Sequence, residues 1–260
     1  MRYTFLALTI ISFAGLWSGC ASTDNPEANT IEASFKSAEE LEKDERYEEA
    51  IAKYGEIKSK NPYSRFAVEA ELKIADIHFK REAYIEAETA YQLFKDFHPK
   101  HPKIDYVTFR LGLSYFNDLP TSIDRDLGPA TKAIQFFDEV INFYSTSQYV
   151  KEAKEKREAA YRMLAEKEAY IGHFYFKREM YDSAGRRFEA LLAKYPGHGL
   201  DEEALYRAGV SAFEIGDKEK GAKHLKTLIE RFPKSKWVSD ARSALEKYGR
   251  RWWKRIIRFS

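Results

Sequence analysis

The sequence predicts an all-α protein in which five helix pairs stack side by side into a solenoid that ends in a capping helix. Three observations support this fold class. A small–large–large residue pattern recurs five times, prolines separate most of the copies, and residues 150–170 contain neither proline nor glycine. Recurrence at a fixed period is the signature of a repeat array, and an uninterrupted polar stretch favours one long helix, which we expect near 148–178.

The first 19 residues predict a signal peptide that ends at Cys20, the only cysteine of the chain. Arg2 is the only charged residue before it, and residues 3–17 form an apolar run that is too short to span a bilayer. Small residues and then Cys20 follow, which resembles the lipobox of bacterial lipoproteins, although Trp17 stands where leucine is usual. The resemblance implies that Cys20 carries acyl chains. The alternative is an ordinary signal peptide with an incidental cysteine.

Residues 20–30 are expected to form a lipidated, flexible tether, because they are polar and contain no core residue. Fully extended, these residues reach about 35 Å from the lipid. With no second cysteine, no intramolecular disulfide can form. By resemblance to the sorting of such lipoproteins, Ala21 after the cysteine favours the outer membrane.

The second helix of each pair carries a small residue followed by large apolar residues four and seven positions later. This spacing places all three on one helix face. The small residues are Ala50, Ala87, Ala133, Ala184 and Gly221. The first helices carry small residues too, among them Ala75, Gly112, Gly172 and Gly209, which allow a partner helix to approach closely.

The repeat period is 37 residues once two insertions are removed, one of nine at 117–128 and one of fourteen within 145–171. This resembles the tetratricopeptide class, whose unit is about 34 residues. Pro62, Pro99, Pro196 and Pro233 end second helices, and Ser64 and Ser235 offer N-caps to the helices that follow. We expect units one to three over 31–147, units four and five over 148–248 with a capping helix near 236–248, and a basic aromatic tail over 249–260.

The composition argues against nucleic-acid binding and catalysis. The net charge is +2, and five cations without an acid lie in the last twelve residues, so the rest of the mature chain is acidic. His98 and His101 flank a turn that contains Pro99, and two solvent-exposed turn residues are a better interpretation of this pair than a metal site. We expect no catalytic residue, no metal and no cofactor apart from the lipid.

Two surfaces are candidate binding sites. Aligning the repeats places eight residues on the inner, concave face, where they form a groove for an extended peptide or pack against neighbouring helices: Phe35, Leu72, Asp76, Phe79, Tyr106, Phe109, Leu113 and Phe116. The tail joins cations to aromatic residues, which suits an anionic lipid surface, a partner contact or a plain helix end. Its residues include Arg250, Arg251, Trp252, Trp253, Lys254 and Arg255.

Two stretches, HPKIDYVTFRLGLSYF at 101–116 and IDRDLGPATKAIQFFDEVINFYSTSQY at 123–149, resemble BamD-like lipoproteins of the outer-membrane β-barrel assembly machinery. The departures are Trp17, Ser145 in place of a proline, a short loop before Asp124 and the basic tail.

The resemblance implies a non-enzymatic scaffold on the periplasmic face of the outer membrane of a Gram-negative bacterium. Its N-terminal units would receive unfolded barrel proteins, and its C-terminal units would dock the POTRA domain of the insertase. Arg187, and less directly Arg186, match the insertase contact, although a solvated helix face explains them too. Other assembly lipoproteins are further candidate partners. The alternative function is a general periplasmic repeat lipoprotein that organises envelope or cell-division proteins.

Overall fold

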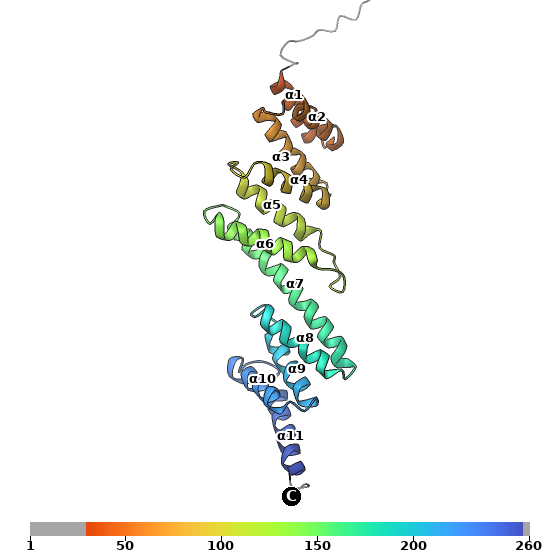
Figure 1. Ribbon diagram of the computed structural model, residues 1–260, viewed down its shortest axis with the longest axis vertical. Helices are drawn as coiled ribbons and strands as arrows, with labels where there is room; N and C mark the ends of the chain where they lie inside the picture. Colours follow the sequence, from red (N-terminus) through yellow and green to blue (C-terminus); the bar gives the residue numbers. More distant parts are fainter. Residues whose placement is uncertain (1–29, 257–260) are drawn as a thin grey trace, which may run out of the picture.

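A computed structural model describes residues 30–256 and the side chains of residues 30–249. Within that range the chain forms eleven α-helices and no β-strand (Figure 1). Their bounds are α1 Ile31–Lys43, α2 Tyr47–Lys60, α3 Arg65–Lys80, α4 Tyr84–Phe97, α5 Ile104–Asn117, α6 Gly128–Phe143, α7 Val150–Lys177, α8 Tyr181–Lys194, α9 Asp201–Glu214, α10 Lys218–Arg231 and α11 Val238–Ile256. The expected array of five helix pairs and a capping helix is confirmed.

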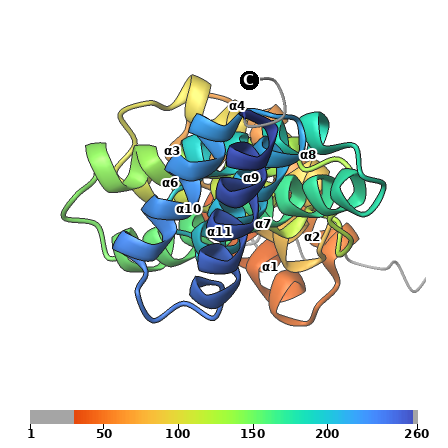
Figure 2. The ribbon, with the colours of Figure 1, turned by 90° about the horizontal axis from the view of Figure 1, so that it is seen from below.

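Each helix packs against the next along the chain, and the pairs stack along one long axis (Figure 1). First helices of neighbouring units also touch, α1 with α3, α5 with α7 and α7 with α9, so they form the inner layer of the array. Viewed along the long axis, successive pairs turn around it (Figure 2). The inner layer therefore winds along the molecule as a continuous face built from first helices.

The small–large–large positions of the second helices form the core. Ala50 and Tyr54 are fully buried and Ile57 is 3% exposed, and the equivalent residues of the other four units are buried as well. The close approach expected from small residues is present: a Cβ added at Gly112 would lie 2.9 Å from Cε1 of Phe137. The sequence pattern thus marks the surface along which the two helices of a pair meet.

The long helix expected near 148–178 is α7, which has 28 residues. At 1.5 Å per residue it is about 42 Å long, twice the length of most other helices here. Its first half packs against α6, where Arg157 donates a hydrogen bond to Asp138 at 2.8 Å. Its second half packs against α8, where Arg187 donates to Glu168 at 3.2 Å. The fourteen-residue insertion therefore lengthens one helix, and that helix joins units one to three to units four and five.

Two details at the helix ends bear on the sequence expectations. Ser64 caps α3 as expected, with its Oγ accepting from the Ala67 amide at 3.1 Å. Ser235 accepts from the amide of Trp237 at 3.2 Å, and α11 begins one residue later, at Val238.

The capping helix was expected to end at 248, but α11 continues through Gly249 to Ile256, because no proline follows Pro233 and four of the eight added residues are arginine or lysine, which favour helix. The first residues of the expected tail therefore extend the last helix.

Candidate functional site

The expected groove residues divide into two groups. Phe35, Leu72, Phe109 and Leu113 are between 3% and 7% exposed and pack inside the hydrophobic core. Asp76, Phe79, Tyr106 and Phe116 are partly exposed. Phe79 and Phe116 also pack against the core while they stay partly exposed, so the structure combines both alternatives, packing and an open inner face.

The four buried residues hold the helices together. Phe35 of α1 meets the Tyr54 ring of α2 edge-on at 5.3 Å between centroids, and Phe109 of α5 stacks on Tyr149 at 5.0 Å. Such aromatic pairs add to the stability gained from area burial. These residues shape the inner face from beneath and present little surface to a ligand.

A polar and aromatic cluster lies where α3, α4 and α5 meet. Asp76 of α3 accepts hydrogen bonds from the hydroxyls of Tyr91 of α4, at 2.5 Å, and Tyr106 of α5, at 2.7 Å. Arg110 of α5 donates to the Tyr91 hydroxyl at 3.2 Å. Its guanidinium lies 3.5 Å from the centre of the Phe79 ring. We call Asp76, Phe79, Tyr91, Tyr106 and Arg110 the inner-face cluster.

Burial sets the protonation of this cluster. Burial, followed by the charge of Asp76, raises the pKa of both Tyr91 and Tyr106 above the ordinary tyrosine value. Both hydroxyls therefore stay protonated and donate to the same carboxylate. Asp76 therefore links α3 to α4 and α5 through the two tyrosines, and Tyr91 in turn accepts from Arg110, which lies against Phe79.

Arg110 is the member of this cluster that the sequence pattern missed most clearly. It comes directly before the packing residues Leu111 and Gly112, and nothing in the pattern distinguishes it from other exposed cations. A signal existed in the repeats: Arg207 stands at the same place in unit five, directly before Ala208 and Gly209, and its guanidinium lies 4.7 Å from the Phe176 ring. An arginine at this repeat position therefore lies over an aromatic ring in two of the units.

Phe116 does not join the cluster. It lies ten residues from Tyr106 on α5, which is about 15 Å along the helix. Lys156 of α7 lies 5.2 Å above its ring, and the ring meets Phe137 edge-on at 6.3 Å. The structure thus brings three of the eight expected groove residues together, Asp76, Phe79 and Tyr106, and adds Tyr91 and Arg110 to them.

The two expected insertase residues lie on α8. Arg187 pairs with Glu168 of α7 while 42% of its side chain stays exposed. Arg186 pairs with Asp182 on the same helix and is 73% exposed. Both line a hollow of about 290 Å³ together with Tyr175, Ser183 and Ala190. The hollow presents two cations beside a tyrosine, a combination suited to an acidic partner surface.

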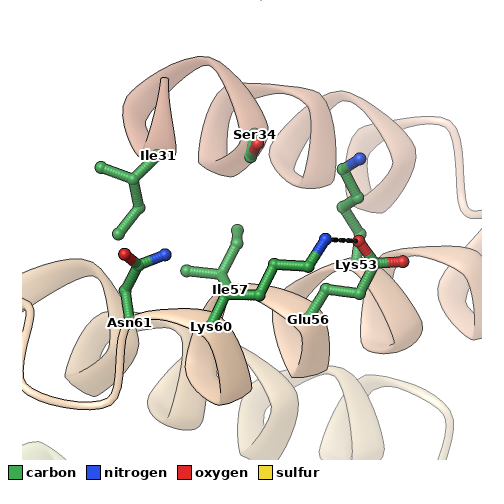
Figure 3. Close-up of a pocket in the computed structure, with 7 residues that line it drawn as sticks. All are labelled: Ile31, Ser34, Lys53, Glu56, Ile57, Lys60 and Asn61. Atoms are coloured by element: carbon green, nitrogen blue, oxygen red, sulfur yellow. Dashed lines mark hydrogen bonds and ion pairs between the residues drawn. The ribbon is translucent and has the colours of Figure 1, made fainter. Parts of the chain in front are cut away.

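A second hollow, of about 400 Å³, lies between α1 and α2 at the N-terminal end of the array (Figure 3). Ile31 and Ser34 of α1 line one side, and residues of α2, among them Lys60, line the other side together with Asn61, which follows α2. Lys60 reaches back to Glu56 at 3.3 Å. The hollow shows that the start of α1 lies beside the end of α2.

The histidines serve packing and ion pairing. His98 lies 2.8 Å from Glu71 of α3, and the rings of His98 and His101 both contact Phe94. Nowhere in the described residues do three or more metal-ligating side chains gather. Nor is any described helix apolar and long enough to cross a membrane. Cys20 and the tail side chains of Arg250, Arg251, Trp252, Trp253, Lys254 and Arg255 lie outside the described residues.

The helix pairs, the repeated core positions and the inner-face cluster define a tetratricopeptide-like scaffold, and a tetratricopeptide-repeat model matches residues 203–235. The model of the outer membrane lipoprotein family YfiO matches residues 27–214. The chain belongs to this family, whose members are non-enzymatic BamD-type outer membrane protein assembly factors.

Relatives from two bacteria carry this description. The outer membrane protein assembly factor BamD of Rickettsia prowazekii is 27% identical over 250 residues, which cover 95% of this chain and 99% of the relative. BamD of Neisseria meningitidis serogroup A is 25% identical over 221 residues, which cover 82% and 83% respectively. The similarity therefore extends over most of both chains.

Proposed function

We propose that this protein is a lipid-anchored scaffold of the β-barrel assembly complex. It receives unfolded outer-membrane proteins on the inner face of units one to three and contacts the insertase through units four and five. The observation that carries the first part is the inner-face cluster. It joins Phe79, Tyr106 and Arg110 of the inner-layer helices α3 and α5 to the buried Tyr91 of α4.

The chemistry of the cluster fits an extended segment with aromatic side chains. Phe79 and Tyr106 are partly exposed aromatic side chains, and Arg110 supplies a cation that is already held over the Phe79 ring. Because Asp76 fixes both tyrosines, a bound peptide need not order them, which lowers the entropic cost of binding. The family resemblance supplies the substrate, the C-terminal segment of an unfolded barrel protein.

A peptide-binding assay tests this assignment. A synthetic C-terminal segment of an outer-membrane barrel protein is titrated into the soluble chain and into its Arg110→Ala variant. We expect the variant to bind about tenfold more weakly, since a desolvated cation–π contact contributes about 1–2 kcal/mol. Arg207→Ala is the matched control, because it removes the equivalent contact in unit five. Equal losses in both variants would place the peptide elsewhere.

The insertase contact is assigned to Arg187. Its exposed guanidinium lies beside the hollow between α7 and α8 and is oriented by Glu168. Arg187→Glu is expected to weaken co-purification of the insertase from detergent extracts, and Lys154→Glu, an exposed cation in the first half of α7, should not. Unchanged recovery with Arg187→Glu would refute the assignment. Recovery of cell-division proteins alone, without the insertase, would refute the assembly role itself.

Anchoring is assigned to Cys20. The Cys20→Ser variant should fold normally and move from the membrane fraction to the soluble periplasmic fraction. Circular dichroism of the purified variant provides the folding control. Continued membrane retention of a folded variant would show that another part of the chain holds the protein to the membrane.

A further inference from the structure

The connections between helices sort onto two edges of the array. Connections within units one to three, at 44–46, 81–83 and 118–127, form what we call the within-unit edge. Connections that follow each unit, at 61–64, 98–103 and 144–149, form the between-unit edge. In Figure 1 the α4–α5 and α6–α7 turns emerge on the left and the α5–α6 connection on the right.

Contacts tie the between-unit edge together. His98 of the second turn lies 2.8 Å from Glu71 near the start of α3, and Lys58 near the end of α2 lies 3.2 Å from the same carboxylate. The ring of Tyr149 in the third turn lies 5.6 Å from that of Tyr106 near the start of α5. The three turns are therefore neighbours along one side of the molecule.

The two edges differ in chemistry. The between-unit turns hold Lys100 and Lys103, no acidic residue and three tyrosines. The within-unit connections hold six acidic residues, three arginines and no aromatic residue. Helix dipoles do not explain the contrast, because every connection follows one helix C-terminus and precedes one helix N-terminus. The segregation therefore needs a cause outside the helices themselves.

Three aromatic side chains on this edge have no packing role. Tyr63 is fully exposed, Phe97 is 74% exposed and Phe143 is 78% exposed. Phe97 and Phe143 are the last residues of α4 and α6, and the equivalent last residue of α2 is Lys60. Exposing large rings to water forgoes the free energy of burial, so such a row marks a surface that another phase or molecule covers.

The chain enters the array on the same edge. Ile31, the first residue of α1, lines the hollow with Lys60 and Asn61, which adjoin the first between-unit turn (Figure 3). The ten residues before it reach back to Cys20 and span at most about 35 Å. A lipid attached at Cys20 therefore holds the bilayer surface within reach of this edge.

We propose that the between-unit edge of units one to three lies against an anionic phospholipid surface. Tyr63, Phe97 and Phe143 enter the headgroup region, and Lys100 and Lys103 are drawn to the anionic lipids. Aromatic rings beside cations are favoured at this interface, and each cation near the surface adds to the attraction. The proposal rests on the proposed anchor at Cys20, and it turns the acidic within-unit edge away from the membrane.

The test uses dyes placed on each edge of the full-length mature chain. Because Cys20 is the only cysteine, Cys20→Ser gives a thiol-free background, and an N-terminal polyhistidine tag takes the place of the lipid. The tag holds the protein on vesicles of phosphatidylglycerol, phosphatidylcholine and a nickel-chelating lipid. Phe97→Cys and Phe143→Cys carry an environment-sensitive dye on the between-unit edge. Ile85→Cys, 64% exposed beside the opposite edge, is the matched control.

We expect dye emission to shift to the blue at positions 97 and 143 and to stay unchanged at position 85. The shift should weaken when phosphatidylglycerol is left out or salt is raised. Equal shifts on both edges, or none at 97 and 143, would overturn the proposal, and tethering through the basic tail alone would give the latter result. Failure of Cys20 acylation leaves this test intact, because the tag replaces the acyl anchor.

Discussion

Among the described glycines, an added Cβ would meet its nearest neighbour at Gly209 of α9, which faces Gly221 of α10, and this contact gives a sharp test of the packing. A Cβ added at Gly209 would lie 2.5 Å from Cδ2 of Leu225, 2.7 Å from its Cγ and 3.2 Å from the backbone carbonyl of Gly221. Leu225 is fully buried, so it has no free space into which it can rotate. In Gly209→Ala, relief requires α9 and α10 to move apart.

The magnitude follows from two opposing effects. Replacing a mid-helix glycine by alanine stabilises a helix by about 1 kcal/mol, and overpacking a close-packed interior costs about 1–3 kcal/mol. At Gly209 the overpacking cost is expected to win by about 1–2 kcal/mol, since part of the clash is with backbone. At Gly55 of α2 an added Cβ meets nothing within 4 Å, so Gly55→Ala retains the gain in full.

Thermal unfolding followed by circular dichroism compares the two variants. We expect Tm to fall by about 3–6 °C for Gly209→Ala and to rise by about 2–3 °C for Gly55→Ala, taking about 3 °C per kcal/mol for a chain of this size. If Gly209→Ala matched or exceeded the stability of Gly55→Ala, the reasoning from close approach would be wrong. Equal stabilisation by both would show that helix propensity, not packing, sets these effects.

Three further predictions follow from single groups. Burial, followed by the charge of Asp118, raises the pKa of Glu88 to about 7. The folded protein therefore holds the proton of the Glu88 carboxyl more tightly than the unfolded chain does. The contribution of this group to the free energy of unfolding is complete below about pH 4.5 and is lost as pH rises through about 7. Glu88→Gln should remove that loss, which is about 1 kcal/mol after solvent screening at this half-buried site. Urea unfolding at about pH 8 measures the difference. An unchanged dependence of stability on pH in the variant would contradict the assignment. Asp76→Ala leaves the buried hydroxyl of Tyr91 without its acceptor and should cost about 1–3 kcal/mol in the same assay, so wild-type stability would exclude the hydrogen-bonded cluster. Glu179 has φ 58° in the α7–α8 turn, so Glu179→Gly should stabilise the fold by about 1 kcal/mol, whereas Gly216→Ala, at φ 91° with open space around it, should destabilise it.

Much of the fold could be read from the sequence because it is encoded locally. The positions of Ala50, Tyr54 and Ile57 recur in each unit, and residues four and seven apart share a helix face whatever lies beyond. The two insertions lengthen the distance between copies of this pattern and leave each copy intact. Their positions therefore predicted both the long helix α7 and the lengthened α5–α6 connection. The end of α11 was misplaced because Gly249, a residue type that often follows the end of a helix, lies inside this one.

The binding surface was only partly predictable from the sequence. The repeat alignment places Phe35, Leu72, Phe109 and Leu113 on first helices. It does not show whether a residue on the inner face is exposed to solvent or covered by a neighbouring helix. That depends on the distance and rotation between successive units, which are set by packing across the whole stack. Cys20 and the side chains of the tail from residue 250 on lie outside the described residues, so their roles stay predictions.

The sequence by itself determined the number of units, their period and the buried small–large–large positions of the second helices, since each follows from helix geometry over a few residues. Only the tertiary structure decided that Asp76 meets Tyr106, thirty residues away, and that Arg110 covers Phe79. The same holds for the sorting of tyrosines and lysines onto one edge and of acids onto the other. The physical reason is that these relations join residues of different helices, and stacking fixes their relative positions.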